Sequence, residues 1–247
     1  PPWPSYMPLQ VQYFKRIAGA HMGQGANGQI IKTSNHVGTH MDGEIHFHGS
    51  GRTIGQVPLE EWVGPGVVVD ISGEVGDYDL YSPEMLTERA DIRKGDILVI
   101  NTGYHRYAWY EPESDEVRYF VKHPGPDPEF HKWALKMKLK WIGVDCGSAD
   151  HPMNTIIRDW HPKLFAEAEA KLKKDYGKEW DEMFPQEVYY QVMHLKLFPE
   201  KLVHAENLGG DIEKLSNKRC WIGCMPLKGM ELESSLCRMV AFGAPEE

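Results

Sequence analysis

The sequence lacks the features that mark several specialised classes of protein. Four cysteines among 247 residues are too few for a disulfide-stabilised scaffold and fit a reducing compartment better. No apolar run approaches the ~20 residues that cross a bilayer, and no repeat or Ser/Gly-rich linker divides the chain. The first residues, PPWPSYMPLQVQ, have neither the basic start nor the apolar stretch of a secretory signal. We therefore expect a cytoplasmic protein, not a membrane protein, in which residues 1–247 form a single domain with a proline-rich arm at residues 1–12.

An excess of positive charge is also missing. The 27 Lys and Arg residues are outnumbered by 36 Asp and Glu residues, which gives a formal net charge of -9. Such a chain would release few counterions from a phosphate backbone, so nucleic acid is not an expected partner. Hydrophobic residues make up 41% of the chain and aromatic residues 11%, which is enough for a sizeable core. We therefore expect a folded protein.

What is present is an alternation of strand-like and helix-like segments. Short β-branched runs predict strands at residues 29–33, 67–71, 97–101, 141–144, 202–204, 219–224 and 236–242. Capping residues, prolines at helix starts and favourable composition predict helices at residues 83–90, 128–138, 162–176 and 185–197. This mixed order is typical of an α/β domain with two or more layers.

Histidines and carboxylates gather in one short segment. Four of the 12 histidines lie between residues 36 and 48, together with two acidic residues: His36, His40, Asp42, Glu44, His46 and His48. His36, His40 and Asp42 offer two imidazoles and a carboxylate to one divalent ion. If the chain is extended from His40 onward, every second side chain points to one face, so the five titratable groups from His40 to His48 would share it. Because such a face is costly without a cation, the pattern predicts a metal site.

The segment resembles the signature His-x-Gly-Thr-His-x-Asp-x-Pro-x-His of the metal-dependent cyclase-like hydrolases, which include bacterial kynurenine formamidase and isatin hydrolase. Glu44 replaces the proline of that signature and adds a carboxylate near the site. The resemblance implies that His36, His40 and Asp42 bind metal and that His46 transfers protons.

A second part of the resemblance lies far downstream. The family has a histidine twelve residues before the glutamate of a Glu-Asn-Leu segment, and here these residues are His194 and Glu206. They are implied as further metal ligands. A third stretch, residues 143–150, resembles a strand and turn near the family's site, where we expect an architectural role. The implied fold is the swivelling β/β/α domain, assembled as a homodimer or homotetramer.

The resemblance implies hydrolysis of a C–N bond by metal-bound hydroxide, with His46 as the proton shuttle. One or two Zn²⁺ or Mn²⁺ ions would bind per chain, with Asp42 bridging two, and no organic cofactor is needed. We expect a small neutral cyclic amide, imide or aryl amide as substrate, stacked on an aromatic wall. Candidates for that wall are Trp3, Tyr6, Trp160, Phe165, Trp180, Phe184, Tyr189 and Tyr190.

Three alternatives remain open at this point. A lactone or ester hydrolase could use the same ligands. A non-haem iron oxygenase also uses two histidines and a carboxylate, although it has no need of a third imidazole such as His46 as a base. A non-catalytic metal-binding protein would bind the ion and leave every amide, imide and lactone intact.

Overall fold

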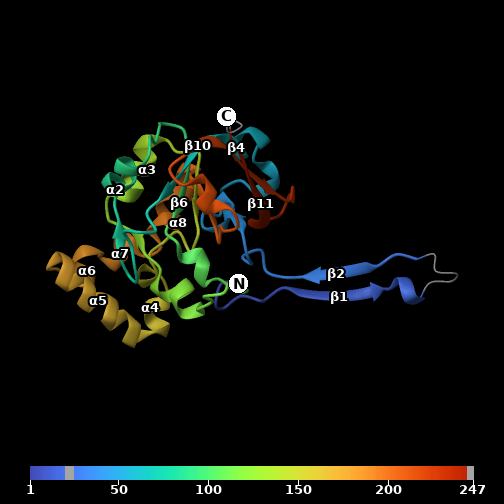
Figure 1. The fold of residues 1–247 in the computed structure, drawn as a ribbon, viewed down its shortest axis with the longest axis horizontal. Helices are drawn as coiled ribbons and strands as arrows, with labels where there is room; N and C mark the ends of the chain where they lie inside the picture. The colour runs from blue at the N-terminus through green and yellow to red at the C-terminus, as the bar shows by residue number, and fades with distance from the viewer. Residues whose placement is uncertain (20–24, 244–247) are drawn as a thin grey trace.

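The computed structural model describes residues 1–19 and 25–243. The protein is built around a closed barrel whose neighbouring strands follow the order β10-β11-β3-β9-β8-β6-β4 (Figure 1). The barrel strands are β3 (His40–Asp42), β4 (Val63–Asp70), β6 (Ile97–Asn101), β8 (Trp141–Val144), β9 (Val203–Glu206), β10 (Arg219–Pro226) and β11 (Ser234–Phe242). Closure pairs every barrel strand on both sides, so the barrel presents no free sheet edge.

The barrel has a parallel half and an antiparallel half. Strands β4, β6, β8 and β9 run parallel, whereas β10, β11 and β3 pair antiparallel with their neighbours. Parallel neighbours need long crossovers, which helices supply. The crossover helices are α2 (Pro83–Arg89), α3 (Phe130–Met137), α4 (Ile157–Trp160), α5 (Pro162–Tyr176), α6 (Trp180–Met183), α7 (Gln186–Tyr189) and α8 (Val192–Leu197).

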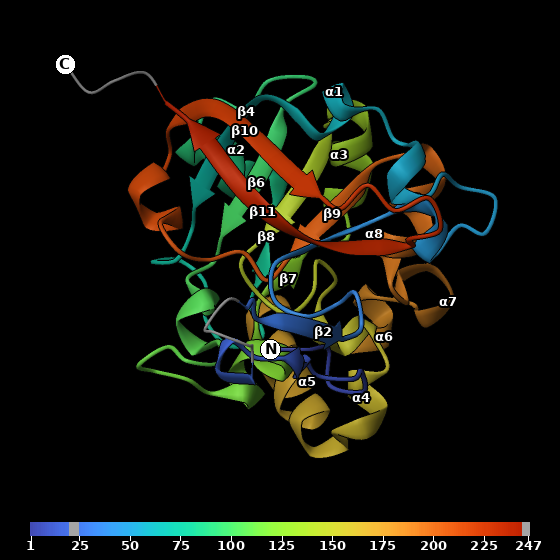
Figure 2. The same cartoon turned by 90° about the vertical axis from the view of Figure 1, so that its right-hand side faces the viewer.

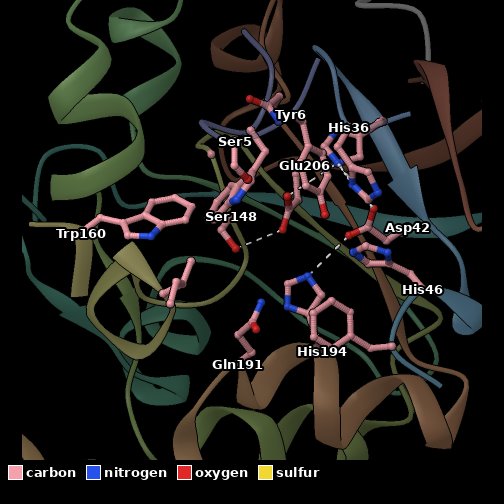
Figure 3. A pocket seen from close by; sticks show the side chains of 16 residues that line it. Ser5, Tyr6, His36, Asp42, His46, Ser148, Trp160, Gln191, His194 and Glu206 are labelled. Atoms are coloured by element: carbon pink, nitrogen blue, oxygen red, sulfur yellow. Dashed lines mark hydrogen bonds and ion pairs between the residues drawn. The ribbon is translucent and has the colours of Figure 1, made fainter. Parts of the chain in front are cut away.

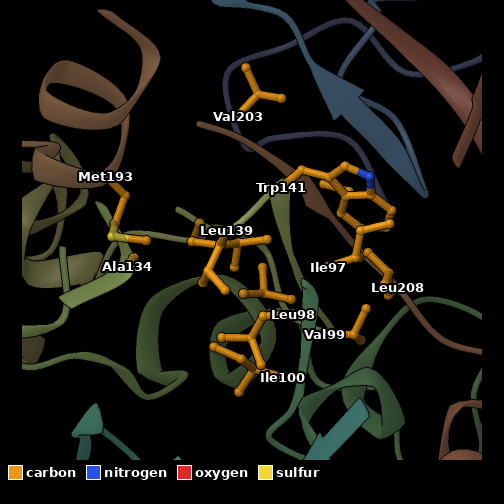
Figure 4. Close-up of a cluster of buried hydrophobic side chains, with 14 of the residues drawn as sticks. Ile97, Leu98, Val99, Ile100, Ala134, Leu139, Trp141, Met193, Val203 and Leu208 are labelled. Atoms are coloured by element: carbon orange, nitrogen blue, oxygen red, sulfur yellow. The ribbon is translucent and has the colours of Figure 1, made fainter. Parts of the chain in front are cut away.

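The main core lies between the barrel strands and the helices against them. Every residue of β6 is buried, because one face of this strand points into the barrel and the other is covered from outside. Figure 4 shows the β6 side chains beside Trp141 of β8 and Met193 of α8. The indole N–H of Trp141 donates to the Trp62 carbonyl oxygen at 3.2 Å, which ties the barrel to α1 (Leu59–Trp62).

A second, smaller core lies under α5 and α6, in the lower part of Figure 2. There the rings of Trp180 and Phe184 stack with their centroids 5.2 Å apart, and Tyr119 and Phe120 are buried beside them. A short parallel pair, β5 (Leu80–Tyr81) and β7 (Gly125–Pro126), lies outside the barrel. This layer holds the long crossover between β8 and β9 against the body of the protein.

A β-hairpin projects from the body near the N-terminus (Figure 1). It consists of β1 (Gln10–Lys15) and β2 (Gly28–Lys32), which pair antiparallel. All six residues of β1 are exposed, and Phe14 and Ile31 are 67% and 64% exposed. Strand β1 begins inside the proline-rich arm expected at residues 1–12, and the projecting segment continues through β2.

Most of the elements predicted from the sequence are present. The strands at 97–101 and 141–144 and the helix at 162–176 have the predicted limits, and the other predicted strands are shifted or extended by a few residues. The helix predicted at 185–197 is divided into α7 and α8 by Gln191, whose φ is +47°. The sequence did not predict strands β1 and β3.

Two expectations from composition can also be compared with the structure. The four cysteines are free thiols. Within the described ranges, no helix has both the length and the apolar character required to cross a membrane.

Candidate active site

The antiparallel half of the barrel brings distant acidic residues together. In the strand register, His40 of β3 lies opposite Glu206 of β9, and Asp42 lies opposite Ser234 of β11. The hydroxyl of Thr39 donates to the Asn207 carbonyl oxygen at 2.7 Å and holds the same two strands together just outside this register. Backbone pairing therefore places the carboxylates of Asp42 and Glu206, which are far apart in the sequence, side by side in the barrel.

Asp42 occupies the centre of the site (Figure 3). Its Oδ1 lies 3.1 Å from His36 Nδ1 and 3.5 Å from His40 Nε2. On the other side, its Oδ2 lies 3.6 Å from His194 Nε2 and 3.4 Å from His204 Nε2. The carboxylate thus has imidazole nitrogens on both sides, an arrangement in which it could bridge two ions.

His194 is held in this position by a carboxylate behind it. Asp150 Oδ2 accepts from His194 Nδ1 at 2.7 Å, and its Oδ1 accepts from the Met193 backbone N–H at 2.9 Å. Because Nδ1 donates to Asp150, Nε2 is the nitrogen with a free lone pair, and this nitrogen faces Asp42. The break at Gln191 starts α8 just before this contact and so directs His194 toward the site.

The stretch at 143–150 also holds the second carboxylate. Glu206 Oε1 accepts from the Ala149 backbone N–H at 2.9 Å and from the Ser148 hydroxyl at 3.2 Å. Together with the Asp150 contact, these bonds fit the architectural role expected for this stretch.

His204 is a member of the cluster that sequence reasoning missed. Its Nε2 lies 3.3 Å from Glu206 Oε1 and 3.2 Å from His194 Nε2. The side chain is fully buried, and its Nδ1 has no hydrogen-bond partner among the described residues. Because His204 and Glu206 are two apart on one strand, they share a face, and the period of two was the signal that could have identified it.

Glu233 is the other member that was missed. Its Oε2 accepts from His36 Nε2 at 3.0 Å and lies 2.8 Å from His46 Nδ1. It precedes β11 in a segment with no histidine nearby, so no local motif indicates its role. The structure therefore gathers all six residues proposed from the sequence, His36, His40, Asp42, His46, His194 and Glu206, and adds His204 and Glu233.

The expectation of an extended segment from His40 to His48 is wrong. Strand β3 ends at Asp42, and the chain turns into a 3₁₀ helix at Glu44–His46. The Glu44 carboxylate turns away from the cluster. It accepts hydrogen bonds from Arg52 Nε at 2.8 Å and from the Arg52 backbone N–H at 2.9 Å. The turn therefore removes Glu44 from the cluster. Its buried carboxylate is paired with the Arg52 guanidinium and so needs no metal ion to balance its charge.

The pKa values of the cluster residues indicate whether a cation would be stabilised there. Burial opposes charge on His194, but the hydrogen bond to Asp150 and the nearby Asp42 carboxylate raise its pKa to about 10. Burial likewise opposes charge on His36, yet Asp42 and Glu233 raise its pKa to about 10. Glu206 is also buried, but contact with His204 lowers its pKa to about 2. These carboxylates therefore require positive charge beside them.

The donor atoms fit a divalent cation. Among the described residues, both oxygens of Asp42 are buried and neither has a hydrogen-bond partner of good geometry, which is costly in a site without a cation. Imidazole nitrogens and carboxylate oxygens are the ligands that Zn²⁺ and Mn²⁺ accept. Among the described residues, three groups are close enough to share an ion. Two of them contain Asp42: Asp42, His194, His204 and Glu206 on one side, and His36, His40 and Asp42 on the other; the third consists of His36, His46 and Glu233.

A cavity of about 240 Å³ opens onto this cluster. Trp3, Tyr6 and Trp160 from the expected aromatic wall line it, and Phe47 joins them. The other expected aromatics do not belong to its lining: Trp180 and Phe184 are buried in the second core, and Phe165 and Tyr189 pack against that core. The aromatic surface beside the cluster thus comes from the N-terminal arm and α4 rather than from α5 and α6.

Known proteins resemble this chain in sequence. The family described as putative cyclase matches residues 1–151, which is more than half of the chain and includes the whole histidine-rich segment. The kynurenine formamidase of Geobacillus thermodenitrificans (strain NG80-2) is 28% identical over 152 residues, which cover 61% of this chain and 64% of that protein. The kynurenine formamidase of Bordetella petrii is 28% identical over 135 residues, or 55% of this chain and 58% of that protein. The matched segment spans less than two thirds of the length of these curated relatives.

Solved structures resemble it in fold. Isatin hydrolase A from Ralstonia solanacearum superposes with a TM-score of 0.72 at 17% identity, covering 96% of this chain and 82% of that one. Isatin hydrolase A from Labrenzia aggregata, bound to benzyl benzoate, gives a TM-score of 0.70 at 19% identity, covering 94% and 82%. These similarities confirm the predicted α/β fold, the swivelling β/β/α fold of the cyclase-like hydrolases.

Proposed function

The chain belongs to the putative cyclase family, and on that premise we propose that it is a metal-dependent hydrolase of a C–N bond in a small cyclic amide, imide or aryl amide. The observation that carries the proposal is the buried Asp42 carboxylate, flanked on both sides by imidazole nitrogens and without a hydrogen-bond partner among the described residues. The kynurenine formamidase relatives and the isatin hydrolase fold support the reaction class.

His36, His40 and Asp42 would hold one ion, and Asp42, His194, His204 and Glu206 would hold a second. A divalent cation, which we propose to be Zn²⁺ or Mn²⁺, supplies Lewis acidity toward a carbonyl oxygen and makes water more acidic. The first group offers three protein ligands, as hydrolytic sites do, whereas the second offers four, as closed structural sites do, and residues of both groups line the cavity.

His46 would move the proton. It lines the cavity, and its ring lies 4.3 Å from the ring of His36 and 5.8 Å from that of His194, measured between centroids. Its Nδ1 lies 2.8 Å from the Glu233 carboxylate, and a proton on that nitrogen would leave Nε2 to accept a proton from water and return it to the leaving nitrogen. An imidazole suits both steps near neutral pH.

The cavity supports a small neutral substrate. Its volume of about 240 Å³ suits a bicyclic molecule better than a peptide. Trp3, Phe47 and Trp160 offer aromatic surface for a planar ring. Within the part of the chain that the structure describes, no lysine or arginine lines the cavity, so no fixed basic side chain there favours a strongly anionic substrate.

The test is a metal analysis of the purified protein followed by a turnover panel. The panel contains isatin, simple imides and lactams, N-formylkynurenine, lactones and aryl esters, each with Zn²⁺ or Mn²⁺ supplied. We expect turnover of a cyclic amide, imide or aryl amide. Turnover confined to esters or lactones would replace the amide assignment with an ester hydrolase, and bound metal without any turnover would leave a metal-binding protein.

An anaerobic assay separates hydrolysis from oxygenase chemistry. Hydrolysis needs no oxygen and no co-substrate, whereas an iron oxygenase that uses His36, His40 and Asp42 would need both. We expect full activity without oxygen. Loss of activity under nitrogen, with recovery in air, would contradict the hydrolase.

We also propose that the chain assembles with a second copy of itself through the projecting hairpin. A two-stranded hairpin is marginally stable in water unless something covers it, and this one exposes Phe14 and Ile31 on the outside. The N-terminal segment up to Met41 contains no acidic residue, and the hairpin carries Lys15, Arg16 and Lys32. All 36 acidic residues lie beyond it, so the body of a second copy has the charge that complements the hairpin.

Light scattering coupled to size-exclusion chromatography tests this assembly. We expect a dimer or tetramer for the native chain and a smaller species for the double variant Phe14→Ser/Ile31→Ser. Val188→Ser is the matched control, because Val188 is an exposed apolar residue on α7, away from the hairpin. An unchanged mass in the double variant would contradict assembly through the hairpin.

A further inference from the structure

The segment before β11 is held rigidly against the histidine-rich segment. Gly43 donates its backbone N–H to the Glu233 carbonyl oxygen at 2.8 Å, and Ile54 donates to the Leu232 carbonyl oxygen at 3.0 Å. A Cβ on Gly43 would meet the Glu233 carbonyl oxygen at 2.8 Å, so the close approach depends on glycine at this position. The backbone of Glu233 is therefore fixed beside Gly43, which is three residues before His46 in the sequence.

The side chain of Glu233 makes three polar contacts. Asn35 Nδ2 donates to Oε1 at 3.1 Å and His36 Nε2 donates to Oε2 at 3.0 Å, while His46 Nδ1 lies 2.8 Å from the same Oε2. Glu233 is thus an acceptor shared by the proposed proton shuttle and a proposed metal ligand.

These contacts select one tautomer for each ring. A proton on His46 Nδ1 leaves Nε2 to exchange protons in the cavity. A proton on His36 Nε2 leaves Nδ1 to face Asp42, from which it is separated by 3.1 Å. Carboxylates behind metal-binding and catalytic histidines commonly fix the ring in this way.

We propose that Glu233 is a positioning residue, which orients His46 for proton transfer and His36 for metal binding through the same carboxylate oxygen. The inference rests on the proposed function for its kinetic consequence. Its effect on ring tautomers and metal affinity is independent of which substrate is turned over.

The kinetic test uses Glu233→Ala with saturating Zn²⁺, so that weaker metal binding does not limit the rate. With isatin or another panel member that the native enzyme turns over, we expect kcat to fall by roughly 10–100-fold with little change in KM. Glu233→Gln keeps an acceptor oxygen and should recover part of the loss. Glu231→Gln is the control, because Glu231 is an exposed glutamate two residues away.

A double-mutant cycle distinguishes positioning from a general structural role. If Glu233 acts on the rate through His46, adding Glu233→Ala to His46→Asn should cost less than about threefold in kcat. A loss as large as in the native background would overturn the positioning role, as would an unchanged kcat in Glu233→Ala.

If no panel member is turned over, the proposed function fails. A spectroscopic and a binding measurement then still test the role of Glu233. In the Zn²⁺-loaded protein, ¹H–¹⁵N spectra of the imidazoles should show the His46 proton on Nδ1 and its loss from Nδ1 in Glu233→Ala. The affinity for Mn²⁺ alone should fall by roughly 10–100-fold in Glu233→Ala and stay unchanged in Glu231→Gln. An unchanged tautomer together with unchanged Mn²⁺ affinity would overturn the inference.

Discussion

Two groups of buried histidines in this molecule differ in the charge state that their surroundings favour. At the edge of the barrel, His36 and His194 contact carboxylates, and their pKa values are raised to about 10 despite burial. Beside the second core, His123 and His151 are also buried, but neither has a carboxylate partner among the residues that the structure describes. Burial lowers the pKa of His123 to about 4. Burial, together with the nearby His123, lowers the pKa of His151 to about 3.

The difference lies in the hydrogen-bond partners rather than in the number of histidines. His123 donates to the Pro124 carbonyl oxygen, and His151 accepts from the Met153 backbone N–H at 3.1 Å, so both rings are neutral members of a packed core. His36 and His194 instead face the carboxylate of Asp42 with one ring nitrogen. Carboxylates behind and beside the ring therefore separate a candidate ligand from a structural histidine.

The largest expected effect comes from removing a proposed ligand of the cluster. In His40→Ala, only His36 and Asp42 remain of the first ligand group, so the ion held there and the activity should be lost together. Metal analysis by mass spectrometry and the turnover assay measure the two quantities. His151→Gln is the matched control from the other group and should keep its metal content; loss of metal in that variant as well would break the distinction between the two regions.

His46→Asn separates proton transfer from metal binding within the first region. If His46 is not a ligand, metal content should be retained while kcat falls by roughly 10²–10⁴-fold, as expected for the loss of a general acid and base. Metal content and kcat are measured on the same preparation. An equal loss of metal in His46→Asn and His40→Ala would show that His46 belongs to the ligands.

Glu206→Ala tests the second side of Asp42. The native chain should bind two ions and the variant one, because Glu206, His194 and His204 supply that side. His204→Ala should weaken the same ion, since its Nε2 faces both Asp42 and Glu206. Equilibrium dialysis against Zn²⁺ gives the stoichiometry. One ion in all three proteins would leave Glu206 and His204 as residues that support a single-ion site.

The sequence predicts the parts of the fold that follow from local patterns. The run at Ile97–Asn101 is apolar up to Ile100 because the strand is buried on both faces, so its limits can be read directly. Strand β3 has only three residues, and none of them is β-branched, so its strand character comes from pairing with β9 and β11. Glu44 could not be placed, because its partner Arg52 depends on the turn between them.

The candidate site divides in the same way. The histidine-rich segment is recognisable because its spacing is local, and His204 could have been found from its alternation with Glu206. Glu233 could not, because it lies 197 residues from His36 and reaches it only through the pairing of β3 with β11. Contacts set by sheet closure leave no local trace in the sequence.

The smallest expected effect concerns the structural histidines and acid stability. The folded-state pKa of His151, about 3, is below the ordinary value of 6.5, so the unfolded chain takes up the proton first as the pH falls. Its contribution to stability is therefore complete above about pH 6.5 and is lost progressively as the pH falls toward 3. Between pH 7 and 4.5, one such histidine should cost about 2–3 kcal/mol of the free energy of unfolding.

Replacing that histidine should flatten the dependence of stability on pH. In His151→Gln, the free energy of unfolding is expected to be lower at pH 7, because the buried contacts of the ring are lost. Its fall from pH 7 to pH 4.5 should nevertheless be smaller than in the native chain by about 2–3 kcal/mol, since no proton is taken up at this position on unfolding. Urea unfolding of metal-free protein at the two pH values measures the difference and cancels the contribution of the metal cluster. His123→Gln should behave similarly, whereas His161→Gln, at an exposed position, should keep the native pH dependence. Equal falls in the native chain and in both buried variants would mean that these rings are not held neutral, and the contrast between the two groups of histidines would fail.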